Sequence, residues 1–191
     1  ALILAGNLLM VYHAVMKTIA NTLIVVDMQY DFLSGGALSV PGADMELAKR
    51  IDRLAKLFDH VLVTADDHPA DHVSFSTFPP HCIHDTHGAA LAVSCASSIL
   101  YKGKNRDSEE FSAFAQGRRL NMIEGKDVYV CGVAGEYCVK ATIEDVVRFA
   151  PEKRVFAIVD LIKSVDGSSY IEHDPFEGKV RFVTSDQVAR R

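Results

Sequence analysis

Cys138 lies where a buried strand is expected to turn into a helix, which is a favourable position for a thiolate nucleophile. The run from Val128 to Cys131 is apolar and rich in β-branched residues, as in a buried strand. Gly132 and Gly135 then bracket a tight connection into residues with apolar side chains at helical spacing. A helix N-terminus offers unpaired N–H groups and a partial positive charge, which lower a cysteine pKa and bind an oxyanion. The pattern indicates acyl transfer, although cysteine is also a common core residue.

Two charged residues also follow apolar strands. Asp27 ends the run Leu23 to Val26, and Lys102 ends the short apolar strand in SSILYKG. Ligands of open α/β sheets bind at the carboxyl ends of the strands, so polar residues that cap separate strands indicate one shared pocket. We expect Asp27 to act as the base for the thiol, with Lys102 as the third member. Taken alone, Lys102 also fits a solvated lysine at a strand end.

Histidines are concentrated in one loop, since five of the eight in the chain lie between His68 and His87. Asp66 and His68 are separated by one residue after an expected strand, and two prolines hold the backbone before His81. A carboxylate with two or three imidazoles suits zinc, iron or manganese. We predict one divalent metal ion, zinc first among these, at Asp66, His68 and His81, with His72 as an additional ligand. The alternative is a histidine-rich surface loop.

The elements that must position these side chains alternate between strand and helix patterns. This alternation predicts an α/β fold with a doubly wound, mainly parallel six-stranded sheet and helices on both faces. The clearest helix is Met45 to Phe58, which begins after Asp44. Its apolar face consists of Leu47, Ile51, Leu54 and Leu57. The last crossover, Asp166 to Gly178, contains Pro175 and is expected to be short or irregular. The expected strands are Leu23–Val26, His60–Thr64, Ile99–Lys102, Val128–Cys131, Val155–Val159 and Val180–Thr184.

Length and composition fit one domain of an α/β enzyme, with 191 residues and 49% hydrophobic content. We assign residues 16–191 to this domain. Residues 1–15 form an apolar leader or extended start that is too short to span a bilayer. A net charge of −5 and dispersed basic residues disfavour binding to nucleic acids and anionic membranes. The four cysteines form no CxxC pair, which indicates a reducing cytoplasm and no structural disulfides.

Several longer motifs occur in a recognisable order after Met16: IVVDMQYDFLSGGALSVPGAD, TADDHPADHVSFS, FPPHC, LYKG followed by FSAF, and VCGVAGEYCVKAT. In this order and spacing the chain resembles the nicotinamidase (pyrazinamidase) branch of the isochorismatase-like cysteine hydrolases. The resemblance implies hydrolysis of the carboxamide of nicotinamide or pyrazinamide to the acid and ammonia. It implies Cys138 as the nucleophile, Asp27 as the general acid/base and Lys102 as the third catalytic residue.

The same resemblance implies further site residues. The metal ligands would be Asp66, His68 and His81, with His72 at a fourth position that some members use. An oxyanion hole would be formed by the backbone N–H groups of Ala134 and Cys138, arranged by a cis peptide bond between Val133 and Ala134. Phe32 and Phe78 match positions that flank an aromatic substrate, and both also fit ordinary core packing.

The chain departs from the family pattern close to this pocket. Gly135 and Glu136 stand where Thr and Asp are usual. The sequence IHDTHGAA after Cys82 replaces a Gly-Thr-Pro-Gly turn and adds His84 and His87, which we place outside the ligand set. This altered rim keeps a different small amide, ureido compound or vinyl ether open as the substrate. A non-catalytic metal-binding or redox module is a third alternative. The expected partners are a small carboxamide molecule and further copies of the chain in a homo-oligomer.

Overall fold

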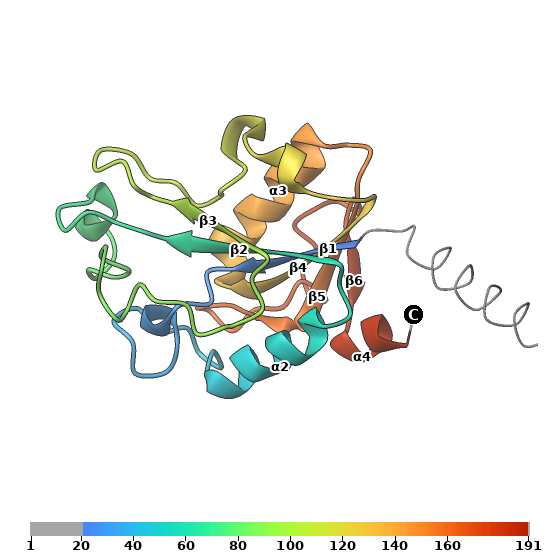
Figure 1. The fold of residues 1–191 in the computed structure, drawn as a ribbon, viewed down its shortest axis with the longest axis horizontal. Helices are drawn as coiled ribbons and strands as arrows, with labels where there is room; N and C mark the ends of the chain where they lie inside the picture. Colours follow the sequence, from blue (N-terminus) through green and yellow to red (C-terminus); the bar gives the residue numbers. More distant parts are fainter. Residues whose placement is uncertain (1–20, 191) are drawn as a thin grey trace, which may run out of the picture.

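The computed structural model describes residues 21–190, which fold around one sheet of six parallel strands (Figure 1). The strands are β1 (Asn21–Val26), β2 (His60–Asp66), β3 (Ser98–Lys102), β4 (Asp127–Val133), β5 (Arg154–Lys163) and β6 (Arg181–Val183). Their order in the sheet is β3-β2-β1-β4-β5-β6. The order reverses between β1 and β4. Ligands of doubly wound sheets bind at the carboxyl ends of the strands that flank such a reversal.

Helices lie on both faces of the sheet. Helices α2 (Met45–Ala55) and α4 (Ser185–Ala189) cover one face, and α3 (Lys140–Phe149) covers the other (Figure 1). Asp44 caps α2 as expected, because its carboxylate accepts a hydrogen bond from the Leu47 N–H at 2.8 Å. Short helical turns complete the chain: η1 (Tyr30–Phe32), η2 (Val73–Ser76), η3 (Ala115–Gly117), η4 (Leu120–Met122) and the π-helical turn η5 (Gly135–Val139).

The central strand β1 is apolar throughout because both of its faces are buried. Leu23 and Val25 belong to the core beneath α2, whereas Ile24 and Val26 belong to the core beneath α3. Strand side chains alternate between faces, so a strand covered on both sides carries no polar alternation. This burial holds the end of β1, and the residue that follows it, in a fixed position between the two layers of helices.

The predicted fold class is confirmed: the sheet is doubly wound and parallel, all six expected strands are present, and both faces carry helices. The predicted end of the first helix was wrong, because α2 stops at Ala55 instead of Phe58. The N–H groups of Leu57 and Phe58 bond to carbonyls three residues back, which tightens the chain into a turn and leaves Leu57 58% exposed.

The last crossover is irregular, as expected. Between β5 and β6 the chain forms turns around Pro175, and residues 164–180 contain no helix. Strand β5 is longer than expected and continues through Asp160, whose carboxylate accepts hydrogen bonds from Ser185 and pairs with Arg50. The charge of Asp160 is therefore balanced from α2 and from the start of α4.

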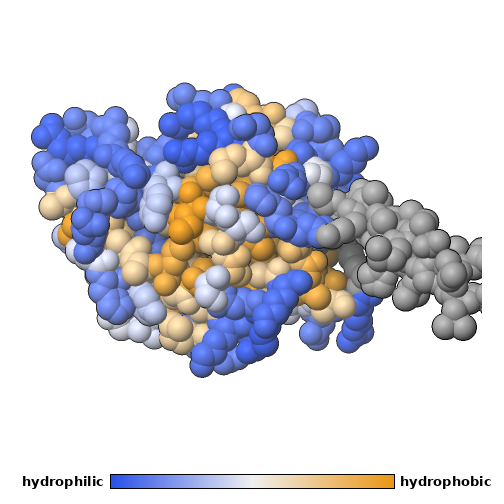
Figure 2. Space-filling model, viewed as in Figure 1, coloured by the Kyte–Doolittle hydropathy of each residue, from blue (hydrophilic) through white to orange (hydrophobic). Residues whose placement is uncertain are grey.

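The edge strand β3 is less well covered than the centre of the sheet. The connection from β2 to β3 contains only the short turn η2, and Ile99 and Tyr101 are 40% and 42% exposed. Figure 2 shows a band of hydrophobic residues on this face, bordered by polar ones. The predicted leader at residues 1–15 lies outside the described residues. Across residues 21–190, no helix has the length and apolar character needed to cross a bilayer.

Candidate active site

Three strands, β1, β3 and β4, bring the predicted catalytic residues to one edge of the sheet. Asp27 directly follows β1, Lys102 ends β3, and Cys138 lies five residues after β4. Asp27 is fully buried, and its backbone adopts a left-handed conformation with φ of 50°. Such a conformation costs free energy that neighbouring bonds must offset. Thr64 on β2 supplies two of them, since its carbonyl accepts from the Asp27 N–H at 3.1 Å and its hydroxyl donates to Asp27 Oδ1 at 2.6 Å.

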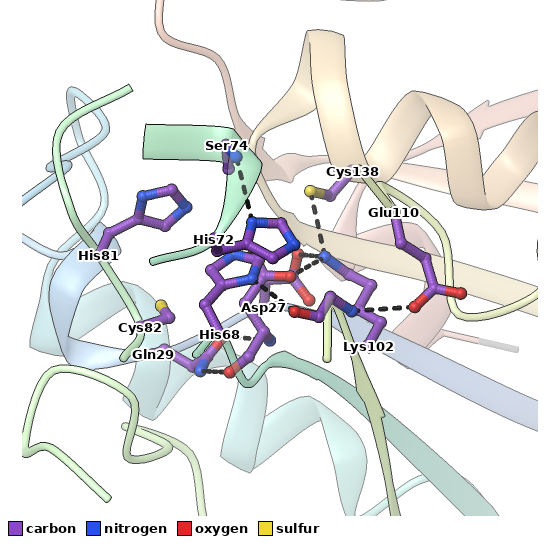
Figure 3. A network of polar contacts seen from close by, with 12 residues as sticks. Asp27, Gln29, His68, His72, Ser74, His81, Cys82, Lys102, Glu110 and Cys138 are labelled. Atoms are coloured by element: carbon purple, nitrogen blue, oxygen red, sulfur yellow. Dashed lines mark hydrogen bonds and ion pairs between the residues drawn. The ribbon is translucent and has the colours of Figure 1, made fainter. Parts of the chain in front are cut away.

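Lys102 lies at the centre of a buried polar network (Figure 3). Its ammonium nitrogen is 2.8 Å from Asp27 Oδ2, 2.6 Å from Asp66 Oδ1 and 3.4 Å from Cys138 Sγ. The residue is only 1% exposed, so its alternative interpretation as a solvated lysine was wrong. A lysine is almost never fully buried without a charged partner, and Lys102 has two.

One ammonium serves two buried carboxylates, and the two therefore titrate differently. Burial opposes the ionisation of Asp66, but Lys102 and His68 hold the pKa of Asp66 below its usual range. For Asp27, burial outweighs the attraction of Lys102 and raises the pKa of the carboxyl group. The nearby negative charge of Asp66 raises this pKa further. Asp27 is accordingly the carboxyl group that is better prepared to hold a proton.

Cys138 lies on the π-helical turn η5, which precedes α3. Burial raises the pKa of the Cys138 thiol well above its usual value; Lys102 opposes the rise, whereas Asp27 reinforces it. The expectation that a helix N-terminus lowers this pKa was therefore wrong, because desolvation outweighs the favourable partial charge. The resting sulfur is a thiol that needs a base. Ligand atoms of Asp27, Asp66 and Cys138 lie within 4.8 Å of one another.

The backbone before Cys138 has the predicted cis peptide bond between Val133 and Ala134. The Ala134 carbonyl accepts hydrogen bonds from the N–H groups of Tyr137 and Val139, each at 3.1 Å. The glycines that bracket this connection allow close packing. A Cβ on Gly132 would lie 2.1 Å from the Val26 carbonyl oxygen, so only glycine lets β4 approach β1 here.

The three predicted metal ligands lie together, with ligand atoms of Asp66, His68 and His81 within 4.8 Å of one another. His68 Nδ1 is 2.8 Å from the Gly103 carbonyl oxygen, and His81 Nδ1 is 2.7 Å from the Pro79 carbonyl oxygen. A ring nitrogen that faces a carbonyl carries the proton, so Nε2 of each neutral ring keeps its lone pair. Burial lowers the pKa of His81, which favours this neutral form. The donor set fits a divalent metal ion.

His72 lies beside this cluster, but its nitrogens face backbone groups (Figure 3). Nδ1 accepts a hydrogen bond from the Ser74 N–H at 3.2 Å, which leaves the proton on Nε2, 3.2 Å from the Ser108 carbonyl oxygen. The ring stacks on His68, with the centroids 4.1 Å apart. The structure therefore does not bring His72 into the group of atoms that share the metal position.

A largely apolar cavity of about 110 Å³ opens beside Cys138 and the metal-ligand cluster. Phe32 and Phe78, both singled out in the sequence, contribute to its wall. Tyr137 packs its ring edge-to-face on Phe78, with the centroids 5.6 Å apart, and Phe111 lies 5.8 Å from Tyr137. The complete lining is Phe32, Leu38, Val40, Asp66, His68, Ser74, Phe78, His81, Glu109, Phe111, Ala134, Tyr137, Cys138 and Val165.

A protein-family model described as an isochorismatase domain matches residues 21–170. The chain belongs to the isochorismatase family. The nicotinamidase/pyrazinamidase of Mycobacterium tuberculosis is 36% identical over 173 residues, which cover 79% of this chain and 90% of that relative. The resemblance inferred from the motifs is thereby confirmed.

Two solved structures resemble this isochorismatase-family chain in three dimensions. The pyrazinamidase of Pyrococcus horikoshii, in complex with zinc, has a TM-score of 0.73 and 32% identity, and the match covers 86% of this chain and 98% of that one. PnC1 from L. infantum, in complex with nicotinate, has a TM-score of 0.77 and 30% identity, with coverage of 87% and 93%. These similarities agree with the α/β fold described above.

Sequence reasoning missed a residue that holds the Asp66 backbone in this isochorismatase-family protein. The Gln29 side chain is fully buried; its oxygen accepts from the Asp66 N–H at 2.8 Å, and its nitrogen donates to the carbonyls of Asp66 and Ala89, each at 2.8 Å. Gln29 stands two residues after Asp27, and the only signal in the sequence is a polar residue within the DMQYDF motif.

The altered rim is held by its own contacts. His84 lies outside the ligand cluster and is hydrogen-bonded to Asp67 at 2.6 Å. His87 packs edge-to-face against Tyr30, with the ring centroids 4.4 Å apart. Asp31 accepts a hydrogen bond from the Cys82 N–H at 2.7 Å, which ties the rim to the segment after β1. The added histidines of this family member therefore have structural partners at the rim.

Proposed function

We propose that this protein hydrolyses nicotinamide to nicotinate and ammonia, and pyrazinamide to the corresponding acid, through a thioester on Cys138. The observation that carries the proposal is the contact of one buried ammonium, that of Lys102, with Asp27, Asp66 and the Cys138 sulfur beside the cavity. The relatives named above are nicotinamidases and pyrazinamidases, which supports this substrate class.

The size and lining of the cavity support a single aromatic ring as the substrate. Its volume of about 110 Å³ is similar to that of the ~150 Å³ cavity known to bind benzene. Phe32 and Phe78 offer apolar contacts to the faces and edges of a flat ring. A single ring with a carboxamide substituent directed at Cys138 fits these requirements.

In the first half of the reaction, Asp27 accepts the proton of the Cys138 thiol, and the sulfur attacks the carboxamide carbon to form a C–S bond. The oxyanion is stabilised by the backbone N–H groups of Ala134 and Cys138. The C–N bond then breaks, and Asp27 returns its proton to the leaving nitrogen, which departs as ammonia.

In the second half, Asp27 takes a proton from water while the oxygen attacks the thioester carbon. The C–S bond breaks, the sulfur regains the proton from Asp27, and the free acid leaves. The raised pKa values of Asp27 and Cys138 suit this exchange, because burial disfavours the anionic form of both groups. Lys102 stabilises whichever of the two carries the negative charge.

Asp66, His68 and His81 would hold one divalent metal ion, and zinc is the first choice because two imidazoles and a carboxylate are common zinc ligands. A bound ion would supply a Lewis acid for the ring nitrogen of the substrate. Asp66 belongs to this cluster and also forms an ion pair with Lys102, so it would connect the metal position to the catalytic residues. Holding the ring in one orientation would place the carboxamide carbon near the sulfur.

The central test is the release of ammonia from nicotinamide by the purified protein. Cys138→Ala should release none and should retain the wild-type circular dichroism spectrum. Cys95→Ala is the matched control, because Cys95 is outside the site and its loss should leave the rate unchanged. Full activity in the Cys138→Ala variant would refute the assignment of Cys138 as the nucleophile.

Metal content provides a separate test of the ligand assignment. A double variant that replaces His68 and His81 with alanine should contain no stoichiometric zinc, iron or manganese by elemental analysis, whereas His173→Ala should match the wild type because His173 is exposed and distant in the chain. Unchanged metal content in the double variant would show that these residues are not the ligands.

A further inference from the structure

The backbone of Gly103 joins the catalytic cluster to the proposed metal site. Gly103 directly follows Lys102, and its carbonyl accepts the hydrogen bond from His68 Nδ1 at 2.8 Å. This contact sets which nitrogen of His68 carries the proton and leaves Nε2 facing the other ligands. Gly103 has a φ of 66°, a conformation that glycine adopts readily. Because glycine is free to adopt other conformations as well, its neighbours must hold it in this one.

The peptide between Lys102 and Gly103 is held from both sides. The Lys102 carbonyl accepts from the Asp67 N–H at 3.0 Å, and the Gly103 N–H donates to Glu110 Oε2 at 2.9 Å (Figure 3). Glu110 is partly buried, and its other carboxylate oxygen is paired with Arg118. Hydrogen bonds to an ionised acceptor are about twice as strong as neutral ones.

We propose that Glu110, supported by Arg118, is a positioning residue for the metal site: its carboxylate fixes Gly103 so that the Gly103 carbonyl can orient His68. The inference rests on the proposed function, because it takes His68 as a metal ligand. Glu110 itself is absent from both the metal-ligand cluster and the lining of the catalytic cavity in residues 21–190. Groups that orient metal-ligating histidines typically contribute about 10–100-fold to metal affinity.

A simple surface ion pair between Glu110 and Arg118 is the alternative. Exposed pairs of this kind contribute little to stability, and a pair with no further role would leave zinc binding unchanged. The same loop supplies a matched control in Asp107, an exposed carboxylate that pairs with Arg106, whereas the Gly103 N–H donates to Glu110. Removing Asp107 deletes a carboxylate–arginine pair without touching the link to His68.

The experiment measures the dissociation constant for Zn²⁺ by competition with a chromophoric chelator, on the full chain. Glu110→Ala should weaken zinc binding by about 10–100-fold. Glu110→Gln keeps an oxygen that can accept from the Gly103 N–H, so its loss should be smaller but still roughly threefold or more, since the charge is gone. Asp107→Ala should bind zinc as the wild type does.

Zinc binding by Glu110→Ala within about twofold of the wild type would overturn the inference, as would an equal loss in Asp107→Ala or a wild-type protein that binds no zinc. If Glu110→Ala does not fold, Glu110→Gln decides, and wild-type affinity in that variant counts against the inference. The readout needs no substrate. A wild type that binds zinc but releases no ammonia from nicotinamide would contradict the proposed function and leave the role of Glu110 intact.

Discussion

Replacing Gln29 tests whether one buried side chain holds in place the strand end that carries Asp66, a proposed metal ligand. Gln29 is the only side chain seen to bond both the N–H and the carbonyl of Asp66 among residues 21–190, and its nitrogen also reaches the Ala89 carbonyl. Gln29→Glu keeps the size and the acceptor but replaces the nitrogen donor with an oxygen. The carbonyl oxygens of Asp66 and Ala89 then lose their hydrogen-bond donor and face a carboxylate oxygen, which is negative like themselves.

The expected loss follows from these contacts. A buried polar group left without a partner costs about 1–3 kcal/mol. The Asp66 carbonyl is buried and the Ala89 carbonyl partly exposed, so we expect the free energy of unfolding to fall by about 3 kcal/mol in Gln29→Glu. For a protein of this length each kcal/mol lowers the melting temperature by roughly 2–4 °C, which gives a decrease of about 6–12 °C.

The assay is urea unfolding monitored by circular dichroism, together with thermal melting. Gln29→Met, which keeps the volume and removes all three hydrogen bonds, should be at least as unstable as Gln29→Glu. The control is Gln116→Glu, because Gln116 is exposed and carries the same change of charge. If both Gln29 variants unfold within about 0.5 kcal/mol of the wild type, packing and not hydrogen bonding holds this residue, and the reasoning is wrong.

Three further outcomes are expected. Gly103→Ala should weaken zinc binding by about tenfold or more, measured by chelator competition, because the new Cβ would lie 2.4 Å from His68 Cε1. Tyr170→Phe should destabilise the fold by about 1 kcal/mol in urea and lower kcat with little change in KM, because the Tyr170 hydroxyl donates to the Gly135 carbonyl, at the start of the turn that carries the proposed nucleophile Cys138. The hydrogen bond to Asp67 raises the pKa of His84. The stability that this pair adds to the fold is therefore complete below the usual pKa of histidine, and it is lost as the pH rises through the pKa of His84 in the folded protein. His84→Ala should therefore lower the melting temperature more at about pH 5.5 than at about pH 8, and an equal decrease at both would contradict this ion pair.

Much of the fold was predictable because it depends on local patterns. Runs such as Leu23 to Val26 are apolar and β-branched, so they form strands that are buried on both faces. Asp44 marks the start of α2 by capping it, and this signal lies within three residues. The end of α2 could not be predicted from apolar spacing, because the chain tightens into a turn at Leu57 while the periodicity continues.

The ordered motifs also indicated which residues carry the chemistry. Asp27, Lys102 and Cys138 were named from their positions at strand ends, and the structure brings all three together. Strand ends also placed Asp66 and Lys102 at the same edge of the sheet, but the direct ion pair between them was not predictable in this way. The two residues are 36 positions apart, and their contact depends on the register of β2 with β3, which aligns Asp66 with Lys102.

The residue types and their order along the chain determined the family, the parallel sheet and the identity of the acid, the amine and the sulfur. Only the tertiary structure decided how these groups share charge. Because a single ammonium lies between two carboxylates in a buried site, Asp66 stays ionised while the pKa values of Asp27 and Cys138 rise. The orientation of His72 was decided in the same way, since hydrogen bonds with Ser74 and Ser108 turn both of its nitrogens toward the backbone. Burial and long-range contacts control these properties, and neither can be read from neighbouring residues in a sequence.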